Sequence, residues 1–477
     1  MVALSSRAVA LVAVALVMSS IPVEAKRRAV APRAPSVVET SPYLDEALSV
    51  AAWLTSLERS TPTGALNWPP VEGRAGASIG IDAGAAGIGS FFLRLHQTTR
   101  DPKWLDKAER GAQFVLSEFR AGRFNTHEWL GGSAGAADFL LELYALTRNE
   151  VYLQGAHLAG ESLIRTAIVD GDGVYWKHNA QIENTYTGVA HGAAGAAIFL
   201  VKLYNVTKDS RDLDTAERTY RWLTRYKLEL PSTTSRAITW KRLTTDTKGY
   251  NGWCGGSMGI AFLLDELHRA TGKAEYLDLW NATAEGLWIG ASRPREAPLE
   301  IGWVHAPTIG GRTDNLGTAY CHGTAGNGVT LAEAAVRNGA AYFAEGTDAA
   351  GRWLDRVAVA DRGGALWEHF IGGGYRETGL FTGTASVGHG SLKMYALTGN
   401  AAHLNRARTA ARYLLGVAEH PRPGQTRWLN RYDNSSETRE YRTGMYSGVA
   451  GIGLFLIELH DAERGRQVPV RFSPLHP

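Results

Sequence analysis

A short glycine turn that recurs along the chain constrains its fold more than any other feature. The turn reads Gly-x-x-Gly, and subtraction of residue numbers puts successive copies 48 to 67 residues apart. That interval is about twice the length of a simple helical repeat, so each unit has room for two helices and a loop. Seven copies begin at Gly84, Gly132, Gly192, Gly256, Gly323, Ala385 and Gly448, of which the sixth, Ala385-Ser-Val-Gly388, is degenerate.

Two kinds of helix are predicted in each unit. An apolar stretch such as 139–144 or 198–204 follows the turn and predicts an inner helix, and a second stretch with apolar residues three and four apart predicts an outer, half-solvated helix. The amphipathic segment 43–57 precedes the first turn and supplies the first outer helix. Small residues at the start of each inner helix let neighbouring backbones approach. We therefore expect an all-α fold: a single α/α toroid of seven helical hairpins with the glycine turns at one mouth.

The even spread of the repeat argues for one domain despite a length of 477 residues. We assign residues 42–465 to the barrel and 466–477 to a C-terminal tail. The 50 basic residues nearly balance the 47 acidic ones, giving a formal charge of +3. Because the repeat region has no basic run, the sequence argues against a nucleic-acid partner.

The N-terminus predicts export. Arg7 precedes an eleven-residue apolar run, 8–18, and Val23-Glu24-Ala25 is a small-residue cleavage pattern, so residues 1–25 resemble a secretory signal peptide. The run is short of the roughly 20 residues that span a bilayer, which makes an uncleaved anchor the weaker alternative. Residues 26–41 are expected to be a flexible linker, and the mature protein is expected to be secreted or periplasmic without stable membrane insertion.

The only two cysteines, Cys254 and Cys321, each stand two residues before the first glycine of a turn. Equivalent positions of neighbouring repeats meet when the repeats stack, so both thiols and the adjacent His322 are expected to converge. Two thiolates and one imidazole form a credible Zn²⁺ site with a fourth position left open. In an oxidising compartment a disulfide between the two cysteines is the alternative.

An ordered set of motifs makes the chain resemble the lanthionine synthetase C-like family. The set consists of Ala190-His191-Gly192, Trp253-Cys254 and Cys321-His322-Gly323, distributed over the seven turns. The resemblance covers nearly the whole chain after the signal and implies a sevenfold α/α barrel. It also implies Zn²⁺ bound by Cys254, Cys321 and His322.

The resemblance further implies a thiol-addition reaction on a peptide or small thiol substrate. A thiolate bound to zinc adds to the β-carbon of a dehydroamino acid, and the resulting enolate is protonated. His191 occupies the family's His-Gly position and is expected to donate that proton. Glu128 lies where the family usually has an aspartate, which makes it the second catalytic candidate. The alternatives are a capping or core role for His191 and a surface role for Glu128 near a helix start.

Two residues depart from the family pattern. Lanthionine cyclases commonly carry an arginine four residues before the first zinc cysteine and a tyrosine or histidine directly after it, whereas this chain has Tyr250 and Gly255. Without that arginine the enolate would lack one electrostatic stabiliser. The departure keeps open a non-catalytic zinc- or thiol-binding protein.

A carbohydrate-active enzyme is the alternative from another class. Helical toroids also serve glycosidases and lyases, and the chain has 14 tryptophans that offer surfaces for stacking sugars. The acid and base would then come from Asp82, Glu128 and Asp314. The tryptophans placed in loops or beside turns are Trp68, Trp129, Trp176, Trp240, Trp303 and Trp367.

Overall fold

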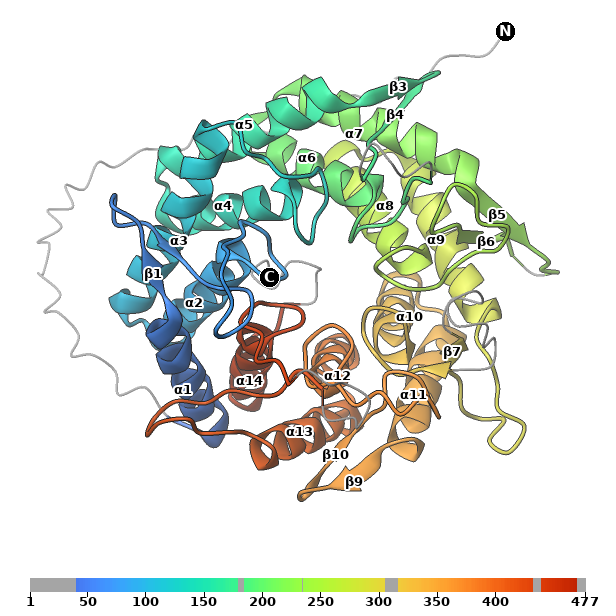
Figure 1. Ribbon diagram of the computed structural model, residues 1–477. Coiled ribbons are helices and arrows are strands. Elements are labelled where there is room, and N and C mark those ends of the chain that lie inside the picture. Colours follow the sequence, from blue (N-terminus) through green and yellow to red (C-terminus); the bar gives the residue numbers. More distant parts are fainter. Residues whose placement is uncertain (1–39, 179–183, 234, 305–315, 432–438, 470–477) are drawn as a thin grey trace, which may run out of the picture. The chain divides into compact units, whose positions relative to one another are not determined.

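The computed structural model describes residues 40–178, 184–233, 235–304, 316–431 and 439–469. Within the unit that begins at Thr40, seven helical hairpins follow one another around a ring (Figure 1). The expected signal peptide and most of the expected linker lie outside the described residues, as do Asp314 and the last eight residues of the tail.

Inner and outer helices alternate along the chain. The inner helices are α2 (Ala85–Thr99), α4 (Ser133–Thr147), α6 (Ala193–Thr207), α8 (Ser257–Thr271), α10 (Thr324–Asn338), α12 (Thr384–Thr398) and α14 (Val449–Glu463). The outer helices are α1 (Pro42–Leu57), α3 (Pro102–Arg120), α5 (Glu150–Thr166), α7 (Ser210–Leu223), α9 (Ala274–Ile289), α11 (Ala341–Arg356) and α13 (Ala401–Gly416). Helix α14 packs against both α1 and α2, which closes the ring. The predicted α/α toroid is confirmed over the described residues.

The glycine turns start the inner helices for a steric reason. The first glycine of each turn is the N-cap, and a Cβ on the second glycine of six turns would overlap the carbonyl oxygen of the residue six positions earlier. The sixth turn was predicted two residues too late: α12 is capped by Gly383, not Ala385. Ser386 takes the place of the second glycine there, and its hydroxyl donates to the Gly383 carbonyl. Because of this serine, the sixth turn does not match the Gly-x-x-Gly pattern, and the sequence alone misplaces it.

A ladder of single backbone hydrogen bonds joins the turns around the mouth. The residue two positions before each capping glycine pairs with its counterpart in the next repeat. The bonds run from Asp82 N to Leu130 O (3.0 Å), Leu130 N to Ala190 O (3.1 Å), Ala190 N to Cys254 O (3.1 Å), Cys321 N to Phe381 O (3.2 Å) and Phe381 N to Tyr446 O (3.0 Å). Between the two cysteines the donor is Trp253 N instead, 2.7 Å from Cys321 O. The ladder therefore shifts by one residue where the cysteines meet.

Buried tryptophans tie the loops to the ends of the outer helices. The six tryptophans considered as sugar platforms are at most 3% exposed. Four of them, with Trp428, donate their indole N–H to a backbone carbonyl near the end of an outer helix: Trp68, Trp176, Trp303 and Trp367. These residues serve packing and are not available for stacking a sugar.

Short β-hairpins, which the sequence did not predict, lie in the loops between helices. Over the described residues, five two-stranded antiparallel sheets pair successive strands. The strands are β1 (Arg59–Ser60), β2 (Leu66–Asn67), β3 (Ile168–Asp170), β4 (Gly173–Tyr175), β5 (Lys227–Leu230), β6 (Ala237–Trp240), β7 (Trp303–Val304), β8 (Leu316–Gly317), β9 (Val359–Asp361) and β10 (Gly364–Leu366). With two to four residues each, they are too short to show an alternating pattern.

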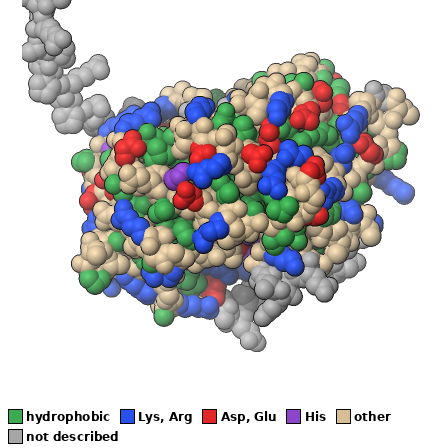
Figure 2. Space-filling view, turned by 90° about the horizontal axis from the view of Figure 1, so that it is seen from above, with side chains coloured by type: hydrophobic (Ala, Val, Ile, Leu, Met, Phe, Trp, Pro, Cys, Tyr) green, Lys and Arg blue, Asp and Glu red, His purple; other side chains and the backbone are tan. Residues whose placement is uncertain are grey.

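Charged side chains are found both inside and outside the ring. Inside, His389 and Lys393 of α12 meet Glu458 of α14, with His389 Nδ1 2.6 Å from Glu458 Oε2 and all three residues buried. On the face seen in Figure 2, Lys and Arg side chains are interspersed with Asp and Glu. No helix among the described residues is long and apolar enough to cross a membrane.

Candidate active site at the mouth of the ring

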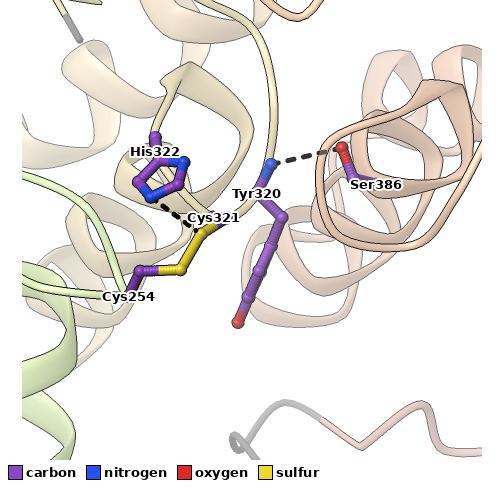
Figure 3. Close-up of a disulfide and its surroundings, with 5 residues drawn as sticks. All are labelled: Cys254, Tyr320, Cys321, His322 and Ser386. Atoms are coloured by element: carbon purple, nitrogen blue, oxygen red, sulfur yellow. Dashed lines mark hydrogen bonds between the residues drawn. A yellow bond between two sulfur atoms is a disulfide. The ribbon is translucent and has the colours of Figure 1, made fainter. Parts of the chain in front are cut away.

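The predicted convergence of the two cysteines and His322 is present in the structure. Cys254 and Cys321, from the turns before α8 and α10, have Cα atoms 5.8 Å apart, and their sulfurs are joined as a disulfide (Figure 3). His322 Nε2 lies 3.2 Å from Cys321 Sγ. Cys321 is fully buried and Cys254 half-buried. The repeat geometry thus brings the three side chains to one point, as their common offset predicts.

The same three side chains form a donor set that suits zinc in one redox state. The two sulfurs and one imidazole nitrogen lie within 4.8 Å of one another. Two thiolates with one histidine are a usual ligand set for Zn²⁺, with a fourth position for a substrate. A disulfide sulfur is not a thiolate, so the chain can offer this ligand set only when the bond is reduced. Metal binding at this cluster and the disulfide are therefore mutually exclusive.

Glu128 and His191 form a carboxylate–imidazole pair beside this cluster. Glu128 Oε2 contacts His191 Nδ1, while Oε1 accepts a hydrogen bond from the Thr126 hydroxyl at 2.9 Å. The glutamate side chain is only 7% exposed, whereas the His191 side chain is 42% exposed. Burial by itself would raise the pKa of Glu128, but the hydrogen bond and positive charge of His191 outweigh it and hold that pKa below its usual value. The pair thus has an anchored base and an accessible imidazole.

Two histidines near Glu128 differ in their surroundings. His178, from the loop after β4, places Nδ1 3.2 Å from Glu128 Oε1 and is 29% exposed. His127 is buried, stacks against Trp176, and has its pKa lowered to about 4 by burial. Sequence reasoning missed His178 altogether. His178 stands at no repeat offset, so no pattern pointed to it.

Arg242 contacts both residues that depart from the family pattern, Tyr250 and Gly255. Its guanidinium lies over the ring of Tyr250, 4.7 Å from the ring centre, and a Cβ on Gly255 would overlap Arg242 Cγ. Arg242 and His322 line one small cavity of about 20 Å³, and the buried Arg242 Nε has no hydrogen-bond partner among the described residues. An arginine is thus present beside the cysteine cluster, although it comes from the loop after β6 and not from position 250.

The two clusters belong to one mouth. Ala190 N donates to Cys254 O at 3.1 Å, so the residue before His191 is bonded to the first cysteine. Thr187 N donates to Arg242 O at 2.9 Å, which ties the loop of His191 to the loop of Arg242. The turns that carry the side chains predicted from the sequence are therefore joined through the backbone, with Cys254, Cys321 and His322 in one cluster and Glu128 and His191 in the other.

Comparison with known proteins places this geometry in context. Residues 84–291 match the family model described as lanthionine synthetase C-like protein, and no curated protein matches the chain. Among solved structures, nisin cyclase has a TM-score of 0.55 at 12% identity, over 82% of this chain and 90% of that chain. Cellobiose 2-epimerase from Bacillus thermoamylovorans has a TM-score of 0.51 at 12% identity, over 88% and 98%. The Lin0763 protein from Listeria innocua has a TM-score of 0.50 at 14% identity, over 89% and 99%.

At these identities the solved structures share a fold with the chain and say nothing of its chemistry. The family match is more specific, because it spans Glu128, His178, His191, Arg242 and Cys254; it ends before Cys321 and His322. The turns, the His-Gly and Trp-Cys motifs and the seven-hairpin ring agree with it. Over residues 84–291 the chain is therefore similar to the lanthionine synthetase C-like family.

Proposed function

We propose that the protein catalyses zinc-dependent addition of a thiol to a dehydroamino acid in a peptide, forming a thioether. The observation that carries the proposal is the junction of two clusters at one mouth, where Ala190 joins the His191 turn to Cys254 by a hydrogen bond. One cluster offers ligands for a thiol-activating metal, and the other offers a proton donor. The match of residues 84–291 to the lanthionine synthetase C-like family model supports the same chemistry.

The cysteine cluster supplies nucleophile activation in its reduced form. A Zn²⁺ ion held by Cys254, Cys321 and His322 would leave one position for a substrate thiol and lower the pKa of that thiol. The substrate sulfur then forms a bond to the β-carbon of the acceptor, and the electron pair of the carbon–carbon double bond moves toward the carbonyl oxygen.

The remaining steps use side chains of the second cluster and its neighbour. His191, as an imidazolium, has N–H groups at both ring nitrogens; Nδ1 faces Glu128, and Nε2 delivers the proton to the α-carbon. Arg242 carries a fixed positive charge on the wall that it shares with His322, where it stabilises the negative oxygen of the enolate. Tyr250 and Gly255 hold this arginine in place by stacking and by leaving space.

The carbohydrate alternative loses one of its supports. The six tryptophans named as surfaces for stacking sugars are buried, which leaves it with the fold analogy and the carboxylates alone.

The test measures metal, free thiols and product on purified full-length protein under reducing conditions, with a dehydroalanine peptide and a small thiol. We expect one Zn²⁺ per chain that is lost in Cys321→Ala. His191→Ala should lower the rate about 10²- to 10⁴-fold and Arg242→Gln about 10²-fold, both with zinc retained. His157→Ala, an exposed histidine on α5, is the matched control.

Three outcomes separate the possibilities. Zinc with thioether product supports the proposal. Zinc without product, with several thiols and acceptors tried, indicates a non-catalytic zinc- or thiol-binding protein. The third outcome is a protein that is reduced and refolded in the presence of Zn²⁺, yet binds no zinc and forms the disulfide again. That outcome would overturn zinc dependence.

Export is part of the proposal and has its own readout. If residues 1–25 are a signal peptide, protein recovered from outside the cytoplasm begins at Lys26, as N-terminal sequencing will show. A chain that keeps Met1 would refute cleavage. The thiol count on the same preparation tells whether the cysteines are reduced or oxidised where the protein resides.

A further inference from the structure

We propose that Glu128, His178 and His191 form a second divalent-cation site, separate from the cysteines and suited to Zn²⁺. The two imidazoles approach one carboxylate from opposite oxygens: His178 Nδ1 lies 3.2 Å from Oε1, and His191 Nδ1 contacts Oε2. One ligand atom from each of the three residues lies within 4.8 Å of the others. One carboxylate with two histidines is the ligand set of a well-known class of catalytic zinc sites.

The surroundings favour a bound ion over a simple surface cluster. Glu128 is buried and anchored by the Thr126 hydroxyl, so its carboxylate is held in place. His178 Nδ1 is buried and has no hydrogen-bond partner among the described residues, although it faces Glu128. A buried nitrogen that faces a carboxylate oxygen at this distance is satisfied either by a proton or by a metal ion bound to both groups.

The geometry allows closure around an ion. The ring centres of His178 and His191 lie 5.7 Å apart with their planes at 80° to each other, and each ring contacts Glu128 through Nδ1. Tetrahedral metal–ligand bonds of about 2.0–2.2 Å keep the donor atoms roughly 3.4 Å apart. Binding an ion therefore requires the widest separation in the cluster to shrink and the contact between His191 Nδ1 and Glu128 Oε2 to open. His178 and His191 are 29% and 42% exposed, so both side chains have room for that movement, and water can occupy the remaining positions.

The proposed site differs from the cysteine cluster in its chemistry. Its donors are nitrogen and oxygen only, so it persists whether Cys254 and Cys321 are reduced or joined. His191 belongs to both arrangements. A cation bound at Nδ1 takes the place of the Nδ1 proton, so an occupied site prevents His191 from becoming the doubly protonated imidazolium that the thiol addition uses. This consequence, unlike the site itself, rests on the proposed function.

The test uses the double variant Cys254→Ala/Cys321→Ala, which leaves the second cluster intact. We expect one Zn²⁺ per chain by equilibrium dialysis. The Co²⁺ form should show d–d absorption without the thiolate-to-cobalt charge-transfer band that the cysteine cluster would give. Adding His178→Ala should weaken Zn²⁺ binding at least about tenfold. Adding His157→Ala, which breaks an exposed histidine–glutamate pair on α5, should leave it unchanged.

Two results would overturn the site: no Zn²⁺ bound by the folded double variant at micromolar metal, or binding that is unaffected by His178→Ala. Glu128→Gln is a second variant that keeps the side-chain volume, in case His178→Ala disturbs the loop. These readouts do not need turnover, so a failure of the proposed function leaves them interpretable. If thiol addition does occur, excess Zn²⁺ should inhibit wild type more than His178→Ala.

Discussion

The ring contains the same pair, a glutamate facing a histidine Nδ1, in two different settings. At the mouth, Glu128 faces His191, whose side chain is 42% exposed. In the interior, Glu458 faces His389, whose side chain is 8% exposed. Burial lowers the pKa of His389 even though Glu458 opposes the shift, and Lys393 adds a buried charge to the same group. The pair alone therefore does not mark a functional site; accessibility of the imidazole does.

The largest effect is expected at the interior pair. Glu458→Ala removes the carboxylate and leaves His389 and Lys393 buried without it, which should lower the free energy of unfolding by about 3–5 kcal/mol. Urea unfolding of the variant and wild type measures the difference. A loss below about 1 kcal/mol would mean that the interior pair is no more structural than the mouth pair.

A buried carboxylate for which burial outweighs a nearby histidine, His157, sharpens the comparison. Burial raises the pKa of Asp212 on α7 to about 6 from 3.8, so the folded protein binds its proton more tightly than the unfolded chain does. Stability should therefore fall as pH rises from about 4 to about 6 and stay lower above that range. Asp212→Asn should remove this fall and stabilise the protein by at most about 3 kcal/mol at pH 7, with no gain at pH 3. Urea midpoints across this pH range measure it, and a parallel pH profile for both proteins would contradict the shift.

The smallest stability effect is expected at the mouth. Glu128→Gln keeps the side-chain volume and the contact with Thr126, and water can solvate its partner His191. The free energy of unfolding should therefore change by about 1 kcal/mol or less. The same variant should lose most of its thioether formation, as measured with the dehydroalanine peptide. A stability loss comparable to that of Glu458→Ala would assign Glu128 a structural role and weaken the proposed site.

The sequence predicted the parts of the molecule that repeat. The capping glycines are local signals fixed by steric overlap, and the cysteines share one repeat offset, so stacking alone brings them together. The predicted position of the sixth turn was wrong because Ser386 replaces its second glycine. His178 and Arg242 were missed because each comes from a loop whose path no periodicity encodes.

Redox state could not be predicted for a different reason. Cys254 and Cys321 at one point suit either a metal or a disulfide, and the choice depends on the compartment as much as on the fold. The tryptophans were ambiguous in the same way, since a loop position does not reveal burial. Only the packed structure shows that they close the ends of the outer helices.

The backbone ladder at the mouth has a consequence for how such a ring acquires new chemistry. Each repeat contributes one equivalent position, and the cysteines occupy two adjacent ones, while Ala190 and Phe381 flank them. Side chains at these positions can be exchanged while the bonds between repeats, which involve only the backbone, stay in place. The mouth is thus a ring of equivalent positions at which side chains can be replaced without changing the fold. The chemistry of such a ring depends on which side chains stand at neighbouring positions.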